Sequence, residues 1–260
     1  TVRPTGDKVG TARRIDDAVG RYIEFTKASF PKGMRLDGLR IVVDCANGAA
    51  YKVGPDTLAE LGADVVAIGN RPNGMNINDN AGSVYPEEMR ATVIREKADL
   101  GIAFDGDGDR VAMADEHGRL LTGNALLAIL GADLIGQKAL PADTLVTTVM
   151  ANAGLERALE PLGGKVLRVN VGDRYVVEAM RRDGYTLGGE SSGHIVMLDH
   201  NTTGDAMIAA LQVLAILVRS DQPLSLLASC YQELPESHEK VELGGAPAPT
   251  AEQLASIVRD

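Results

Sequence analysis

The chain has 260 residues, of which 45% are hydrophobic, enough for the cores of one or two globular domains. Its formal net charge of −10 argues against nucleic acid or an anionic membrane as the main partner, although local arginines could still bind a phosphorylated ligand. Trp is absent and aromatic residues make up 3%, so the cores must be built from aliphatic side chains and Met.

The first half of the chain alternates strand and helix patterns. We expect strands at 39–44, 63–68, 98–104 and 110–114, and helices at 13–30, 50–61, 86–97 and 122–138. Gly62 stops the second helix, and Thr122 is expected to cap the fourth. A strand–helix–strand unit of this length predicts parallel strands with a right-handed crossover. The polar segment 69–84 is expected to be a loop, either a solvated connection or one edge of a ligand site.

The same alternation of strand and helix patterns begins again beyond Pro141. We expect strands at 145–149, 165–169, 185–187 and 195–198, and helices at 154–162, 172–182, 205–219 and 223–231. Thr202 or Thr203 is expected to cap the long apolar helix at 205–219, which we expect to form the centre of a second core. The fold class is therefore α/β, with two consecutive three-layer α/β/α domains whose sheets are mainly parallel and which meet near residue 140.

Three carboxylates alternate with glycine directly after the buried strand at 98–104: Asp105, Gly106, Asp107, Gly108 and Asp109. In an extended chain the carboxylates at every second position would lie ~7 Å apart, too far to share one metal. The two glycines allow positive φ, so the loop can curl and bring the oxygens together. Oxygen ligands without nearby His or Cys favour Mg2+, and the adjacent Arg110 suits a phosphate.

Two other interpretations of this loop are open. It could be only a tight turn, although three Asp side chains this close repel one another without a counterion. It could also be a calcium loop of the EF-hand type, with Asp105, Asp107, Asp109 and Glu116 at loop positions 1, 3, 5 and 12. Arg110 then stands where that loop needs glycine, and a strand rather than a helix precedes it. The sequence favours the phosphate-linked Mg2+ site.

A family resemblance emerges from these motifs. The stretch 105–110 after a buried strand resembles the metal loop of the α-D-phosphohexomutases, and Gly-Gly-Glu-Ser-Ser-Gly-His at 188–194 resembles that family's sugar-recognition loop. The stretches at 20–25, 44–49, 171–176 and 202–205 are similar to the phosphoglucosamine mutase branch. The resemblance covers roughly residues 10 to 245, and several spaced motifs in one order are more specific than any single motif.

The resemblance implies roles for individual residues. Asp105, Asp107 and Asp109 would each give one oxygen to Mg2+, and Arg110 would be the catalytic cation that stabilises the transferring phosphoryl group. The implied substrate-binding residues are Glu190, Ser192, Gly193, His194, Asp173 and Arg174. Three structural alternatives stay open: a surface or capping role for Glu190, a packed His194, and a helix-start pair for Asp173 and Arg174.

The implied reaction interconverts glucosamine 6-phosphate and glucosamine 1-phosphate through a phosphoserine and a bisphosphorylated sugar, and feeds UDP-N-acetylglucosamine and cell-wall synthesis. The implied cofactors are Mg2+ and, as activator, glucose 1,6-bisphosphate or glucosamine 1,6-bisphosphate. The family's serine motif and its C-terminal phosphate loop do not occur among the 260 residues. The resemblance therefore implies the two middle domains of a four-domain enzyme, inactive alone, with the missing outer domains as partners; it also allows a homodimer.

The expected organisation has four parts. Residues 1–37 would be a leader and linker helix from an N-terminal domain, 38–140 the metal-loop domain, 141–244 the sugar-loop domain, and 245–260 a linker into a C-terminal domain. Cys45 and Cys230 are expected to be buried reduced thiols in a cytoplasmic protein. No signal-peptide pattern is present, and the richest apolar stretch, 206–218, is too short to span a membrane.

Two other functions compete. One is a phosphomannomutase or phosphoglucomutase of the same superfamily, which the branch-like motifs disfavour. The other is a non-catalytic module that binds Mg2+ and a sugar phosphate, which the absent serine motif favours.

Overall fold

The first of two sheets has five strands in the order β2-β1-β3-β4-β5 in this computed structural model, which describes residues 5, 10–237 and 250. The strands are β1 (Arg40–Asp44), β2 (Asp64–Ile68), β3 (Leu100–Phe104), β4 (Val111–Ala114) and β5 (Leu120–Leu121). β1 runs parallel to β2 and β3, and β4 is antiparallel to both of its neighbours. The metal loop joins β3 to β4 and therefore lies where the direction of the sheet changes.

The second sheet repeats this plan with four strands in the order β7-β6-β8-β9. The strands are β6 (Thr144–Thr148), β7 (Lys165–Val169), β8 (Leu187–Gly189) and β9 (Ile195–Met197). β6 runs parallel to β7 and β8, and β9 returns antiparallel to β8. The stretch 190–194 joins β8 to β9, so both predicted loops close a hairpin at the end of a parallel strand.

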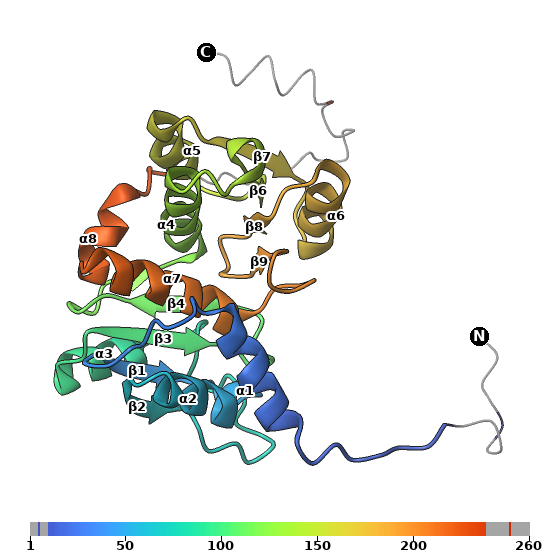
Figure 1. Ribbon diagram of the computed structural model, residues 1–260, viewed down its shortest axis with the longest axis vertical. Coiled ribbons are helices and arrows are strands. Elements are labelled where there is room, and N and C mark those ends of the chain that lie inside the picture. Colours follow the sequence, from blue (N-terminus) through green and yellow to red (C-terminus); the bar gives the residue numbers. More distant parts are fainter. Residues whose placement is uncertain (1–4, 6–9, 238–249, 251–260) are drawn as a thin grey trace, which may run out of the picture.

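Helices cover both faces of each sheet (Figure 1). The α-helices are α1 (Ala18–Ser29), α2 (Ala50–Glu60), α3 (Glu87–Glu96), α4 (Gly123–Gly136), α5 (Gly154–Leu159), α6 (Asp173–Asp183), α7 (Ala206–Ser220) and α8 (Leu224–Leu227). Within the described residues, three short 3-10 helices accompany them at Pro141–Asp143, Glu160–Leu162 and Ala228–Cys230. α3 packs Met89 and Val93 on the outer face of the first sheet, and α6 packs Val176 and Met180 on the outer face of the second. The predicted class of two α/β/α domains with mainly parallel sheets is confirmed.

Helix α7 belongs to both halves of the molecule. It contacts β3 and β4 of the first sheet, β9 of the second, and helices α1 and α4 (Figure 1). Eleven of its fifteen residues are buried, as expected for a helix that is apolar on nearly every side. One continuous hydrophobic cluster consequently runs from Ile41 in β1 to Leu187 in β8. The expectation that α7 centres only the second core was too narrow.

Several local predictions need correction. The first helix begins at Ala18 rather than residue 13, since Ile15 and the other residues from 13 to 17 are exposed and gain no stabilisation from burial. The cap of α7 is Asp205, whose carboxylate accepts the N–H of Ile208 at 3.1 Å, whereas Thr202 and Thr203 are exposed.

Three further expectations were also wrong. Thr122 occupies the N-cap position of α4, but its side chain makes no capping hydrogen bond. β8 spans 187–189 rather than 185–187, because Gly188 and Gly189 are the residues that pair with β6. Cys45 is buried as expected, but Cys230 is exposed.

Among the described residues, no single helix has the length and apolar character needed to cross a membrane. Only the bent helix pair 206–220 and 224–230 reaches that length and apolar character jointly.

Candidate active site between the two sheets

Asp105 organises the metal loop from a fully buried position. Its Oδ1 accepts the backbone N–H groups of Gly108, Asp109 and Arg110, each at 3.1 Å, and its Oδ2 accepts the Arg110 Nε–H at 2.7 Å. Burial raises the pKa of the Asp105 carboxyl, but these donors and the Arg110 charge outweigh it, so the pKa lies below its ordinary value. Asp105 is therefore held ionised and aimed into the loop.

The three predicted carboxylates converge. Asp105, Asp107 and Asp109 each offer an oxygen within 4.8 Å of the others. Burial, followed by the charge of Asp105, raises the pKa of Asp109, and Asp109 Oδ1 is a buried oxygen without a hydrogen-bond partner. A cation among these oxygens would satisfy that orphan atom and neutralise the repulsion, so the donor set fits Mg2+.

The calcium-loop alternative fails on Glu116. This residue lies in the turn between β4 and β5, where its carboxylate accepts hydrogen bonds from the Ser225 hydroxyl and, at 3.3 Å, the Ser225 N–H. It is absent from the carboxylate cluster.

Only one of the two loop glycines needs positive φ. Gly108 has φ +78°, whereas Gly106 is not among the positive-φ residues, so that part of the loop prediction was wrong. Gly106 lies in close packing instead: a Cβ there would come within 2.8 Å of the side chains of Ile77 and Asn78, which would have to shift.

The sugar loop is joined directly to the metal loop. Arg110 and His194 form an isolated antiparallel bridge, and the Val111 N–H donates to the Gly193 carbonyl at 3.1 Å. The His194 ring, 5% exposed, places Nδ1 3.1 Å from Asp109 Oδ2, while its buried Nε2 has no partner. Two loops that lie far apart in the sequence are thus in direct contact.

Glu190, in the loop between β8 and β9, lies beside the start of α6. Its Oε1 accepts the Gly172 N–H at 3.2 Å, which brings the helix start beside the sugar loop. Asp173 and Arg174 follow on this first turn and are exposed; Arg174 pairs with Glu178 of the same helix at 2.8 Å. Ser192 is also exposed at the tip of the loop. The structure brings Glu190 and the helix start together, with Asp173, Arg174 and Ser192 open to solvent beside them.

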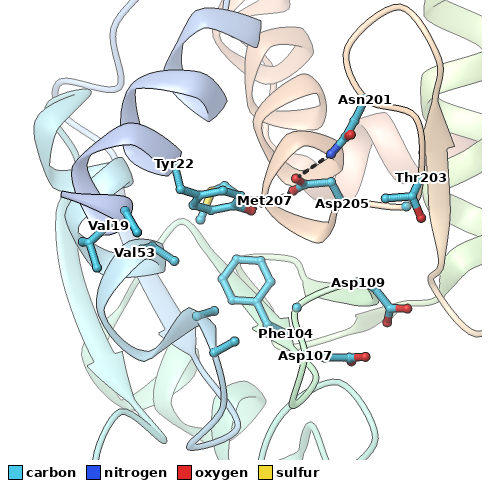
Figure 2. A pocket seen from close by; sticks show the side chains of 15 residues that line it. Val19, Tyr22, Val53, Phe104, Asp107, Asp109, Asn201, Thr203, Asp205 and Met207 are labelled. Carbon is cyan, nitrogen blue, oxygen red and sulfur yellow. Dashed lines mark hydrogen bonds between the residues drawn. The ribbon is translucent and has the colours of Figure 1, made fainter. Parts of the chain in front are cut away.

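A cavity of about 500 Å3 lies on the other side of the metal loop, between α1, α2 and the start of α7 (Figure 2). Asp107 and Asp109 stand on its rim, and Phe104 and Met207 are part of its apolar wall. Tyr22 donates its hydroxyl to Asp205 at 3.0 Å, and Asn201 donates to the other oxygen of Asp205 at 3.1 Å.

Tyr22, Asn201 and Asp205 were missed as site residues, whereas Asp107 and Asp109 of the same cavity were predicted. The available signals were the motifs at 20–25 and 202–205, which contain Tyr22 and Asp205. Predicted site residues from Glu190 to His194 do not line this cavity.

Two consecutive α/β/α units that meet at an acidic loop match two domains of a known enzyme family. Residues 20–118 match the family described as phosphoglucomutase/phosphomannomutase, alpha/beta/alpha domain II, and residues 122–234 match alpha/beta/alpha domain III of the same family. The chain belongs to the phosphoglucomutase/phosphomannomutase family.

Curated relatives carry a more specific name. The chain is 57% identical over 242 residues to a phosphoglucosamine mutase of Anaeromyxobacter dehalogenans, covering 93% of this chain and 53% of the relative. It is 54% identical over 256 residues to one of Magnetococcus marinus, covering 98% of this chain and 53% of the relative. The chain thus spans about half the length of the curated relatives it matches.

Solved structures agree on the fold. A phosphoglucomutase/phosphomannomutase family protein of Burkholderia thailandensis superimposes with a TM-score of 0.73 at 25% identity, over 82% of this chain and 46% of that one. An N-acetylphosphoglucosamine mutase of Aspergillus fumigatus, solved with GlcNAc-6P and magnesium, gives a TM-score of 0.63 at 24% identity, over 82% and 54%.

Proposed function

We propose that this chain forms the two central domains of a phosphoglucosamine mutase, which interconverts glucosamine 6-phosphate and glucosamine 1-phosphate and so feeds UDP-N-acetylglucosamine and cell-wall synthesis. The observation that carries the proposal is the junction of the two loops, in which Asp109 of the metal loop contacts His194 of the sugar loop. The identity of 52–57% to curated phosphoglucosamine mutases supports this branch of the family. Residues 38–140 and 141–244 are the proposed domains; 238–244, much of the expected leader at 1–9 and the expected linker at 245–260 apart from residue 250 lie outside the described residues.

Asp105, Asp107 and Asp109 would hold Mg2+, which when bound supplies Lewis-acid stabilisation of a phosphoryl group in transfer. Arg110 is the proposed catalytic cation. The Arg110 Nε–H donates to the Asp105 carboxylate, and the Arg110 side chain remains 39% exposed. The guanidinium can therefore still face a phosphate from the solvent side. The orientation of this cation is fixed before substrate arrives, which lowers the cost of charge stabilisation.

Glu190, Ser192, Gly193 and His194 are the proposed sugar contacts. Glu190 uses one oxygen to accept the Gly172 N–H, and within the described residues no donor bonds to its other oxygen, which could accept from a sugar hydroxyl. Asp173 and Arg174, exposed on the first turn of α6, are proposed to contact the sugar phosphate. Gly193 has φ +91°, and a Cβ there would collide with the Val111 carbonyl, so glycine is required for the two loops to meet.

The donor phosphoserine and a distal phosphate loop are proposed to come from outer domains of the same enzyme. The reaction would pass through glucosamine 1,6-bisphosphate, with that compound or glucose 1,6-bisphosphate as activator. A structural neighbour from Aspergillus fumigatus has been solved with glucose 1,6-bisphosphate, which supports a bisphosphorylated sugar at such a site. The relative from Anaeromyxobacter dehalogenans is about twice as long as the matched segment, which is consistent with outer domains in the same chain.

The test begins with the DNA that encodes the chain. A reading frame that continues upstream of Thr1 into a Ser-His-Asn-Pro-like motif would support the enzyme, and its product should convert glucosamine 6-phosphate in a Mg2+-dependent coupled assay. A preference of that product for mannose or glucose phosphates would favour a phosphomannomutase or phosphoglucomutase instead. Binding of sugar phosphate without turnover by the complete gene product would favour the non-catalytic module.

A further inference from the structure

The metal loop is held by its backbone on both sides of Asp105. The carbonyl of Phe104, the residue before it, accepts the Ser83 N–H at 2.8 Å. The carbonyl of Gly106, the residue after it, accepts the Ala49 N–H at 2.8 Å. The two donors come from different loops, at 44–49 and 80–83. Together these bonds fix the Phe104–Asp105 peptide group directly before Asp105 and the Gly106–Asp107 peptide group one residue after it, which restricts where the Asp105 carboxylate points.

Asp44 ties these two loops to each other. It is the last residue of β1, is 1% exposed, and is not part of the carboxylate cluster. One oxygen accepts the Ala46 N–H at 2.9 Å and the other accepts the Gly82 N–H at 2.8 Å. A single buried carboxylate therefore bridges the loop that holds Gly106 to the loop that holds Phe104.

The arrangement leaves little room for an alternative. Ala46 is buried in the left-handed region at φ 52°, an unfavourable conformation for alanine that its hydrogen bond to Asp44 helps to maintain. A Cβ on Gly82 would collide with the Phe104 carbonyl, and a Cβ on Gly48 would collide with the Gly106 carbonyl. If Asp44 releases either loop, the contacts of that loop with the Phe104 or Gly106 carbonyl must shift as well.

We propose that Asp44 is a positioning residue for the metal site: it clamps the two loops that fix the backbone on either side of Asp105. The inference rests on the metal site of the proposed function and adds a residue that touches neither metal nor substrate. Loss of an outer residue that orients a metal ligand typically weakens metal binding by about 10–100-fold. The Asp44 carboxylate should act in this way.

The test compares two buried aspartates of the same domain in purified residues 1–260. Asp44→Asn replaces one acceptor oxygen with an NH2 group, which donates and cannot accept. Asp115→Asn is the matched control, since Asp115 is 2% exposed and accepts the His117 and Arg119 N–H groups at 2.9 Å, but in the β4–β5 turn. Mn2+ affinity is measured by electron paramagnetic resonance with Mg2+ competition, and thermal unfolding is measured alongside.

We expect Asp44→Asn to weaken Mn2+ binding by about tenfold or more, and Asp115→Asn to leave it unchanged although both lower the unfolding temperature. Equal affinity in Asp44→Asn and wild type, or equal weakening in both variants, would overturn the proposal. If Asp44→Asn does not fold, Gly82→Ala opens one side of the clamp with the carboxylate intact, and an unchanged affinity there would also overturn it. A wild-type chain that binds no Mn2+ would overturn the metal site itself, and the role of Asp44 with it.

Discussion

Asp109 Oδ2 lies 3.1 Å from His194 Nδ1, although 85 residues separate the two side chains in the sequence. The contact joins the loop after β3 to the loop after β8, and the Arg110–His194 bridge beside it joins their backbones. A substitution that moves one loop should therefore change the geometry of the other, even though the loops belong to different sheets.

Asp107→Ala should abolish divalent metal binding without affecting the fold. Asp107 is the exposed member of the carboxylate cluster, so its removal takes away a ligand and no buried contact. Titration calorimetry of residues 1–260 with Mg2+ should show weak binding, because the chain offers only three carboxylates and water. Asp79→Ala, at another exposed aspartate, is the control and should bind like wild type. Tight binding that survives Asp107→Ala would show that the metal lies elsewhere.

Gly204→Ala should displace the His194 ring. A Cβ at Gly204 would collide with the ring atoms Cε1 and Nε2, so either the ring or the backbone must move, at a cost of about 1–3 kcal/mol. Gly136→Ala is the matched control, since a Cβ there meets nothing within 4 Å at the end of α4, and it should stabilise by up to about 1 kcal/mol. Urea unfolding measures both, and NMR of the His194 ring reports its displacement. An unshifted His194 resonance in Gly204→Ala would contradict the packing described.

Residues 1–260 alone should not turn over glucosamine 6-phosphate. Phosphoryl transfer needs donor, metal and acceptor in near-attack geometry, and such positioning can be worth about 7–11 kcal/mol. The proposed donor serine lies outside the 260 residues. A coupled assay with glucose 1,6-bisphosphate should therefore show no activity, whereas the four-domain protein should be active and its Asp105→Asn variant severely impaired. Metal-dependent turnover by residues 1–260 that disappears in Asp105→Asn would place the nucleophile within this chain.

Ser225→Ala should lower stability in a pH-dependent way. Burial raises the pKa of Glu116, but hydrogen bonds from the Ser225 hydroxyl and backbone outweigh it and hold that pKa below its ordinary value. A lowered folded pKa means that the stabilisation is complete above the unfolded value of about 4.3 and is lost as pH falls through the folded value.

At neutral pH the substitution should cost about 1 kcal/mol of unfolding free energy, and the difference from wild type should shrink in acid. Urea unfolding across this pH range measures it. Ser229→Ala, whose hydroxyl donates to the Leu226 carbonyl instead, should show no such pH dependence. A Ser225→Ala cost that stays constant into acid would exclude Glu116 as the titrating group.

Local features of the chain were readable from the sequence by itself. Strand and helix positions follow from periodicity and from breakers such as Gly62, and the β7 strand at 165–169 lies where the pattern placed it. The carboxylates of the metal loop could be proposed as ligands because their number, spacing and neighbouring glycines are all local. The end of the strand at Phe104 fixes where that loop begins.

Only the tertiary structure decided which distant groups meet. Asp205 rather than a threonine caps α7, because burial selects the residue whose carboxylate faces both Ile208 and Tyr22. Gly106 serves close packing rather than positive φ, because Ile77 and Asn78 approach it from a loop nearly 30 residues earlier. The contact of Asp109 with His194 depends on how the two sheets pack against α7. Such contacts depend on the relative placement of whole elements, and periodicity within one segment carries no information about that placement.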